Sequence, residues 1–391
     1  MDHSILLRKL EIYGFSSGSI SWFKSYLESR IEVIQVQTKF SEPHQLGCYA
    51  VPQGSILGPL LFLIYNNDFP ACSVEGSSVL FADDNTDNVA SENVIDLQAK
   101  LQREANRSTD WVQDNRMVCS GPKTKLLIIG TPQLQKKLLD GPIITVSVCG
   151  SIVQATESEQ LLGLTINNKL TWSSYLNGEK WREKGNFIGL IPQLNQRVDI
   201  LSPLSKLIPK ENFKRISSGI FYSKLLYCLQ VFSHVWGLQN LDEESRRFQA
   251  YTKSDHKKLQ VLQNKVLRLK SGLPFRSSTR DLLQATGDLS VQQLAAYSIL
   301  VTAKKAMVTQ HPSYLASKLR VGLNPNKPMT RQHDKLFIQS NLSIARSGFF
   351  CRSAALLNQL PREVRNCGDI DDFKRQVRSW IQLNIPIRPD S

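Results

Sequence analysis

Two adjacent aspartates, Asp83 and Asp84, follow a run of apolar residues in the stretch "SVLFADDNTDN" at positions 78–88. The run is short and contains β-branched and aromatic residues, so it predicts a strand that leads to a turn at "DDNTDN". Two carboxylates on a rigid hairpin tip repel each other unless a cation binds them, and carboxylate oxygens are preferred ligands of Mg²⁺. The pattern therefore indicates a divalent-metal site, and a solvated turn that binds nothing is the alternative.

A second polar stretch, "VPQGSILGPLLF" at positions 51–62, lies upstream of the two aspartates. Its glycines allow the backbone to approach a ligand closely, and its prolines stiffen the loop. Gln53 and Ser55 offer hydrogen bonds to such a ligand. A plain loop before a core helix has the same composition, so the string alone leaves both interpretations open.

Helices and short strands are predicted around these two stretches. Apolar residues at helical spacing indicate a helix in "HSILLRKLEIYGF", ended by Gly14, and another in "SISWFKSYLESR". "IEVIQVQ" alternates as strands do, and an apolar helix is expected to begin near Ile56. An amphipathic helix with Ser91 as its N-cap follows, and "KTKLLIIG" and "EQLLGLTINNKLTW" are each expected to form a strand.

Beyond about residue 180 the pattern becomes helical. "SDHKKLQVLQNKVLRLKSG" carries an apolar face and ends on Gly272, and Ser290 with Gln293 has the spacing of a capping box. The segment 311–338 is Pro-rich and basic and indicates a linker. A last helix, "DDFKRQVRSWIQL", is expected to be capped by Asp371 or Asp372.

The composition favours a polyanionic partner. The 391 residues include 48 lysines and arginines against 34 aspartates and glutamates, a formal charge of +14. The basic residues are spread along the chain, which favours nucleic acid over a membrane, and a basic protein with scattered lysines is the alternative. Seven cysteines without a CxxC pair, no secretory signal and no apolar run of membrane-spanning length predict an intracellular protein of the nucleus and cytoplasm.

Three strings in fixed order, "PQGSILGPLLF", "NNDFP" and "FADD", resemble motifs of the reverse transcriptases of non-LTR retrotransposons of the LINE and jockey type. That family has "PQGSxLGPLLF", "INDLP" and "FADD". "MDHSILLRKL" is similar to its "VDHxxLLxKL" and "LLGLTINNKLTW" to its "LGVxLDxxLxW". The "FKRQV" tail is similar to its "FKxxL", so the resemblance covers nearly the whole chain.

The resemblance implies an α+β fold with three parts. Residues 1–180 would form a partial right-hand polymerase palm, an antiparallel sheet with packed helices that lacks the fingers and the first catalytic strand. Residues 181–310 would form a helical, thumb-like region. Residues 311–391 would form the basic linker and a C-terminal helical tail.

The resemblance also implies roles for single residues. Asp83 would coordinate two Mg²⁺ or Mn²⁺ ions with help from Asp84, and Lys125, or else Lys123, would lie near the leaving pyrophosphate. The turn at Leu162 and Gly163 would grip the primer strand. Contacts with template and nucleotide would come from Pro52, Gln53, Gly54, Ser55, Phe81 and Ala82. The basic helix face would follow the nucleic-acid backbone through Lys257, Lys258, Lys265 and Arg268, with a solvated face as the alternative.

One departure from the family pattern concerns the metal site. The family uses a third aspartate on a strand before the "VDH" string, and Met1 stands where that string's valine would be. Two carboxylates alone would bind metal weakly, so the chain by itself is expected to copy an RNA template from a DNA primer and deoxynucleotides poorly or not at all. The alternatives are a non-catalytic nucleic-acid-binding remnant of a mobile element and an unrelated metal-dependent phosphotransferase.

Overall fold

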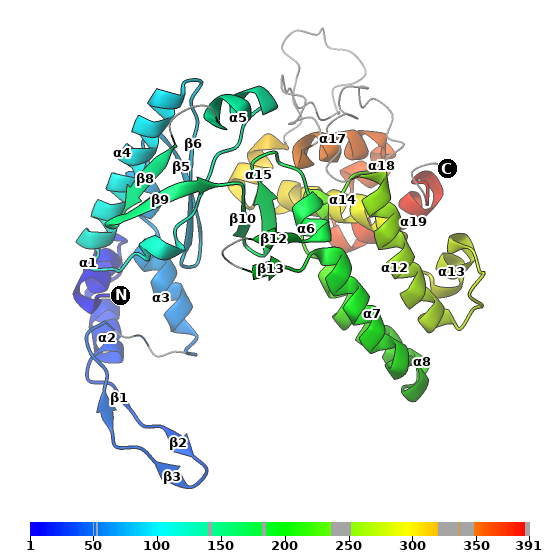
Figure 1. Cartoon of the computed structure of the whole chain (residues 1–391). Coiled ribbons are helices and arrows are strands. Elements are labelled where there is room, and N and C mark those ends of the chain that lie inside the picture. Colours follow the sequence, from blue (N-terminus) through cyan, green and yellow to red (C-terminus); the bar gives the residue numbers. More distant parts are fainter. Residues whose placement is uncertain are drawn as a thin grey trace. The chain divides into compact units, whose positions relative to one another are not determined.

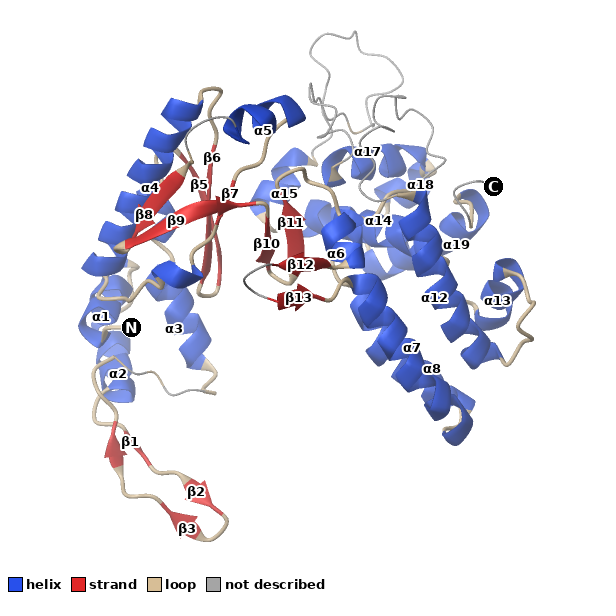
Figure 2. Ribbon diagram, viewed as in Figure 1, coloured by secondary structure: helices blue, strands red, loops and turns tan. Residues whose placement is uncertain are grey.

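The computed structural model describes residues 1–49, 51, 54–139, 143–181, 185–235, 252–319, 336 and 348–387. The contacts between residues divide the chain into two compact units, Met1–Glu159 and Gln160–Ser391. The fold is mixed α+β, with mostly helices and a few small sheets (Figures 1 and 2). The three-part division expected from the sequence stays a prediction.

Three helices form the hydrophobic core at the start of the first unit. They are α1 (His3–Ile12), α2 (Ser17–Leu27) and α3 (Leu57–Asn66). Both predicted N-terminal helices are confirmed, and Gly14 follows the first one with a φ of +86°. The shared core consists of Leu6, Leu10, Leu27, Leu61 and Tyr65. Burying such side chains contributes about 1.5–3 kcal/mol each.

A narrow arm of four two-residue strands extends from the end of α2 (Figure 1). β1 (Ile31–Glu32) pairs with β4 (His44–Gln45), and β2 (Gln35–Val36) pairs with β3 (Lys39–Phe40). The strand character predicted for "IEVIQVQ" is confirmed in two short pieces, β1 and β2, and not as one continuous strand. The backbone hydrogen bonds of the arm are interrupted between β1 and β2. There the amide of Ile34 donates to the Ser41 hydroxyl at 2.9 Å and not to a backbone carbonyl.

The two aspartates belong to an antiparallel hairpin of β5 (Gly76–Phe81) and β6 (Asp84–Val89). The predicted strand is confirmed, but the turn predicted over "DDNTDN" is wrong, because only Ala82 and Asp83 connect the strands. The polar residues after them form β6, where each residue is paired in register with one of the apolar strand. At the hairpin base a Cβ on Gly76 would lie 1.8 Å from the Asn88 carbonyl oxygen, so only glycine fits.

The long helix α4 (Val94–Asp114) and a three-stranded sheet complete the first unit, with α5 (Pro132–Leu139) and the short 3₁₀ helices η1 (Phe69–Cys72) and η2 (Gly121–Lys123). The sheet order is β7 (Leu126–Leu127), β9 (Ser151–Thr156), β8 (Thr145–Val148). β7 runs parallel to β9, so the expectation of an antiparallel sheet is only partly met. The N-cap of α4 is Asn93, not Ser91, whose hydroxyl donates to Asp96 instead.

The second unit begins with small hairpins and continues as helices. β10 (Ser158–Leu161), which crosses the boundary between the units, pairs with β11 (Leu164–Asn167), so the single strand predicted there is wrong. A further hairpin joins β12 (Glu179–Trp181) to β13 (Gly185–Phe187). The first helices are α6 (Ser173–Asn177), α7 (Leu190–Leu207), α8 (Lys210–Ser217), the π-helix η3 (Ser218–Tyr222), α9 (Ser223–Leu226) and α10 (Leu229–Phe232).

The remaining helices surround a large shared core. They are α12 (Lys253–Ser271), α13 (Thr279–Thr286), α14 (Val291–Thr309), α15 (Ser313–Lys318), α17 (Phe349–Gln359), α18 (Arg362–Asn366) and α19 (Ile370–Asn384). The core combines residues from α7, α12, α14, α17 and α19. Among the described helices, none has both the length and the hydropathy that crossing a bilayer requires.

Local signals located two of these helix ends correctly. Gly272 ends α12 with a φ of +75°, and Ser290 with Gln293 forms the predicted capping box of α14. The cap of α19 is Asp369, which accepts the Asp372 amide at 2.6 Å, so the prediction of Asp371 or Asp372 is wrong by two or three residues. Most of the predicted linker 311–338 lies outside the described residues, and α15 occupies part of the rest.

Candidate functional site

Asp83 and Asp84 lie at the exposed tip of the β5–β6 hairpin. Asp83 is in the turn, and Asp84 is the first residue of β6 and pairs with Phe81 through the backbone. Within the described part of the chain, neither carboxylate makes a hydrogen bond or an ion pair with another side chain. The hairpin therefore presents two adjacent negative charges to solvent without a protein cation to neutralise them.

The residues before the aspartates leave one side of β5 uncovered. Ala82 adopts a left-handed φ of +54°, which few non-glycine residues do. Val79 and Phe81 share one face of the strand and are 57% and 63% exposed. Phe81 and Ala82, predicted to contact nucleotide, are thus accessible beside the carboxylates.

Helix α4 holds the base of this hairpin through a buried carboxylate. Glu104, only 3% exposed, accepts the backbone amides of Val74 (2.9 Å) and Glu75 and pairs with Arg107 at 3.1 Å. Burial raises the pKa of Glu104, but the hydrogen bonds from Glu75, Val74 and Ser73, together with the charge of Arg107, lower it by a larger amount, so the net shift is downward. The ionised carboxylate fixes the start of β5 against α4.

Two further contacts join the hairpin to the same helix. Arg103 pairs with Glu75 at 2.8 Å. Farther along, Ser108 donates to Asp87 of β6 at 3.2 Å, and Asp87 also accepts the Ser78 hydroxyl of β5 at 2.5 Å. The hairpin that carries Asp83 and Asp84 is therefore attached to α4 at several points along its length.

Changing Glu104 to glutamine is expected to loosen the hairpin. A glutamine could still accept both amides through its Oε1, because both contact one oxygen of Glu104, but it would lose the negative charge that strengthens these hydrogen bonds and pairs with Arg107, which costs about 1–2 kcal/mol of unfolding free energy. Urea denaturation measures this loss, and hydrogen exchange at the Val74 and Glu75 amides locates it. Glu92→Gln, at an exposed residue without a described partner, is the matched control. Equal stability of both variants would contradict a clamping role for Glu104.

The "PQGS" loop is only partly described. Pro52 and Gln53 lie outside the described residues. Gly54 has a φ of +83° and open space where a Cβ would be. The Ser55 hydroxyl accepts the Gly58 amide at 3.0 Å, so this side chain also stabilises the first turn of α3.

Lys125 does not pair with either aspartate in the described contacts. Its ammonium donates to the Pro122 carbonyl at 2.9 Å, within its own loop, and its side chain is exposed. Lys123 is the last residue of the short helix η2 and is also exposed. The roles near pyrophosphate stay predictions for both lysines.

The predicted turn at Leu162 and Gly163 is present between β10 and β11. Both residues have positive φ, +48° and +78°, and glycine at the second position lowers the cost of this turn. The Tyr227 hydroxyl donates to the Leu162 carbonyl at 2.5 Å, and its ring would lie 3.7 Å from a Cβ on Gly163. Tyr227 stabilises the turn through this hydrogen bond. The sequence around Tyr227 does not indicate such a contact.

Three of the four predicted backbone-binding cations on α12 already have partners within the second unit. Lys258 donates to Asn177 at 3.0 Å, Lys265 donates to Asn195 at 3.2 Å, and Arg268 donates to the Ser277 carbonyl at 3.4 Å. Lys257 is exposed and makes no described side-chain contact. The acceptors of these three bonds are neutral, so the bonds do not cancel the positive charges. Among the four cations, Lys258 alone has an acidic partner in the described contacts, Asp255 at 3.5 Å.

Asp2, another acidic residue of the first unit, has a structural role as the N-cap of α1. One carboxylate oxygen accepts the amides of Ser4 and Ile5 at the start of α1, and the other accepts Arg116 at 2.8 Å. Burial raises its pKa, but the hydrogen bonds from Ser4 and Arg116 outweigh this effect and lower the pKa to about 2. Both oxygens are occupied, so Asp2 is a poor candidate for a metal ligand.

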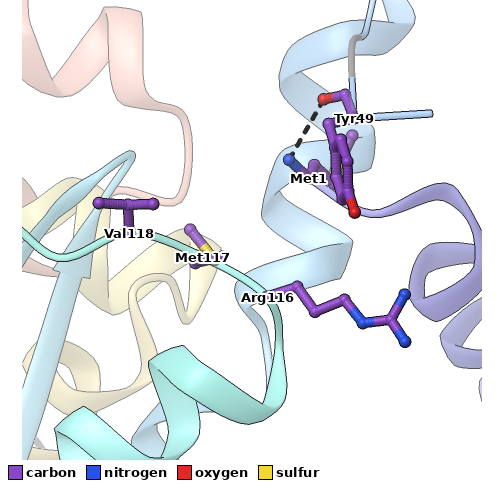
Figure 3. A pocket seen from close by; sticks show the side chains of 5 residues that line it. All are labelled: Met1, Tyr49, Arg116, Met117 and Val118. Atoms are coloured by element: carbon purple, nitrogen blue, oxygen red, sulfur yellow. Dashed lines mark hydrogen bonds between the residues drawn. The ribbon is translucent and has the colours of Figure 1, made fainter. Parts of the chain in front are cut away.

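A shallow pocket beside Asp2 does not add a metal site. Met1, Tyr49, Arg116, Met117 and Val118 line it, and the Met1 amino group donates to the Tyr49 carbonyl at 3.3 Å (Figure 3). Arg116 already pairs with Asp2, and the lining contains no carboxylate. Over the described residues as a whole, no three His, Cys, Asp or Glu side chains converge as a metal site would require.

Comparisons with known proteins identify distant relatives. No family model and no solved structure matches the chain. It is 26% identical over 329 residues to the RNA-directed DNA polymerase from mobile element jockey of Drosophila melanogaster, covering 80% of this chain and 31% of that protein. It is 27% identical over 331 residues to the probable RNA-directed DNA polymerase from transposon X-element of the same fly, covering 83% and 32%.

These matches confirm the resemblance stated from the motifs. The chain is distantly homologous to reverse transcriptases of non-LTR retrotransposons. It spans about a third of the length of the curated relatives it matches.

Proposed function

We propose that this chain forms part of an RNA-directed DNA polymerase of a non-LTR retrotransposon and that the β5–β6 hairpin supplies its metal-binding carboxylates. One observation carries the proposal: Asp83 and Asp84 lie, unneutralised by described side chains, on an anchored hairpin of a chain homologous to such polymerases.

Asp83 and Asp84 would hold Mg²⁺ or Mn²⁺, which when bound stabilises negative charge on the attacking and leaving oxygens of a phosphoryl transfer. The donor chemistry fits, because exposed carboxylate oxygens suit hard divalent cations. The hairpin's task is positioning. Its attachments to α4 through Glu104, Arg103 and Ser108 limit the movement of the two carboxylates.

Other residues would bind and orient the reactants. In the proposed reaction a primer 3′-hydroxyl attacks the α-phosphate of a deoxynucleotide, and pyrophosphate leaves. Phe81 and Ala82 are accessible to the nucleotide, and the Leu162–Gly163 turn, supported by Tyr227, would hold the primer strand. Lys125 is exposed on a short loop from which its ammonium could move to the leaving group once it releases the Pro122 carbonyl.

The proposal includes slow turnover by this chain alone. In the described residues no third acidic side chain converges with the two carboxylates. A divalent ion would therefore have few anionic ligands from the protein. We therefore expect millimolar rather than micromolar metal requirements and a low incorporation rate.

Primer extension on RNA homopolymers tests the proposal. Purified chain with Mn²⁺ or Mg²⁺ is given oligo(dT) on poly(rA) or oligo(dG) on poly(rC), each with the four deoxynucleotides separately. The expected result is incorporation of only the complementary nucleotide. Incorporation that ignores the template would instead support a metal-dependent phosphotransferase.

A second candidate is a non-catalytic nucleic-acid-binding protein. The formal charge of +14 and the absence of a three-ligand acidic cluster from the described residues favour it. It predicts RNA binding that weakens steeply with salt yet is indifferent to Mg²⁺ and to Asp83→Asn, with no extension on either template.

A further inference from the structure

The loop between α12 and α13 in the second unit (Figure 1) carries an exposed aromatic residue. We call residues 272–278, "GLPFRSS", the Phe275 loop. Phe275 is 84% exposed, an unusual position for a phenylalanine, which normally gains about 1.5–3 kcal/mol from burial. Among the aromatic side chains of the described residues it is the most exposed.

The ring is held in place from one side. The Arg268 guanidinium of α12 lies over it, 5.2 Å from the ring centroid, and also donates to the Ser277 carbonyl of the same loop. The Ser277 amide donates to the Pro274 carbonyl at 3.1 Å and closes a turn around Phe275. Arg268 covers one face of the ring, so the high exposure of Phe275 belongs to the opposite face and the edge.

Further cations lie on the Phe275 loop and next to it, with little acidic compensation. Arg276 and Arg280 are exposed, and neither makes a side-chain contact with another described residue. The Lys210 ammonium lies 3.6 Å from where a Cβ on Gly272 would be. The acidic residue nearest in sequence, Asp281, is engaged in the capping box of α13 with Ser278.

We propose that the Phe275 loop is a stacking site for an unpaired base of single-stranded nucleic acid, with Arg276 and Arg280 binding the adjacent phosphates. An exposed aromatic face stacks on any base, and free cations beside it bind a polyanionic backbone. Bases in a duplex are already stacked on both sides, so the loop selects single strands. The site needs neither metal nor Asp83 and is independent of the polymerase proposal.

Binding of a fluorescent 12-nucleotide oligo(U) or oligo(dT), followed by anisotropy in EDTA, tests the site. We expect Phe275→Ala to weaken affinity about 5- to 100-fold, the usual loss for one stacked base, and Phe275→Trp to preserve it. Tyr314→Ala, at an exposed aromatic residue of α15, outside the Phe275 loop, is the matched control and should change little. Comparing the affinities for oligo(U) and oligo(dT) shows whether the loop discriminates between RNA and DNA.

Two further measurements separate stacking from charge. An oligonucleotide with abasic sites should bind the wild-type chain and Phe275→Ala equally. Arg276→Ala with Arg280→Ala should reduce the slope of log affinity against log salt by about 0.7 for each cation, whereas Phe275→Ala should leave the slope unchanged. Unchanged affinity of Phe275→Ala, or an equal loss on the abasic strand, would overturn the proposal, as would preference for an acidic peptide over the oligonucleotide.

Discussion

Asp83→Asn is expected to lower template-directed nucleotide incorporation roughly 1000-fold. A metal ion contributes several kcal/mol of charge stabilisation in the transition state, and each 1.36 kcal/mol changes the rate about tenfold. Asparagine keeps the size of the side chain and removes its charge, so the exposed turn should stay folded. Single-turnover primer extension with Mn²⁺ measures the effect, and Asp84→Asn should give a smaller loss.

Metal binding provides a readout of Asp83 that does not require turnover. Free Mn²⁺ gives a sharp electron paramagnetic resonance signal that bound Mn²⁺ loses, so titration gives the affinity of the hairpin directly. The matched control is Asp110→Asn on α4, an exposed carboxylate without a described partner. If Asp83→Asn and Asp110→Asn changed Mn²⁺ affinity and incorporation equally, the hairpin would not be the metal site.

Arg352→Met is expected to destabilise the second unit by about 3–5 kcal/mol, because several charge-assisted hydrogen bonds, each worth about 1.5–3 kcal/mol, are lost. Arg352 is 1% exposed on α17, and its guanidinium donates to the carbonyls of Gln230 (3.1 Å), Val231 (3.0 Å) and Ser233 at the end of α10. Methionine fills similar volume but leaves these buried acceptors without their donor. Differential scanning calorimetry should show a melting temperature about 10 °C lower.

The exposed Arg375→Met on α19 is the control for Arg352, because its side chain is largely in solvent and pairs only weakly with Asp372. It should change stability by less than about 0.5 kcal/mol. A similar small effect for Arg352→Met would show that the three carbonyls are satisfied in another way.

The same region gives the second unit a pH dependence. Burial, reinforced by the charge of Arg352, lowers the pKa of His234 to about 4. The unfolded chain binds a proton near pH 6.5 and the folded chain only near pH 4, so stability decreases as pH falls through this window. In Arg352→Met the pKa of His234 should rise, and this decrease should become smaller.

The sequence by itself determined the features that depend on neighbours within a few residues. Gly272 ends α12, and Ser290 with Gln293 caps α14, because these contacts span three or four residues of one helix. It also determined the identity of the paired aspartates and the kinship with mobile-element polymerases, since residue types in a fixed order carry both. Where several acceptors stand close together, as at Asp369, Asp371 and Asp372, local patterns chose the wrong cap.

Only the tertiary structure decided what holds these elements in place. Glu104 contacts amides 29 and 30 residues away, Tyr227 contacts Leu162 across 65 residues, and Arg352 reaches α10 across about 120. The polar run after Asp83 became a strand because β5 supplied its backbone partners. Such contacts depend on which surfaces meet when the chain collapses, and burial then sets the energy and the pKa of each polar group, which no local pattern encodes.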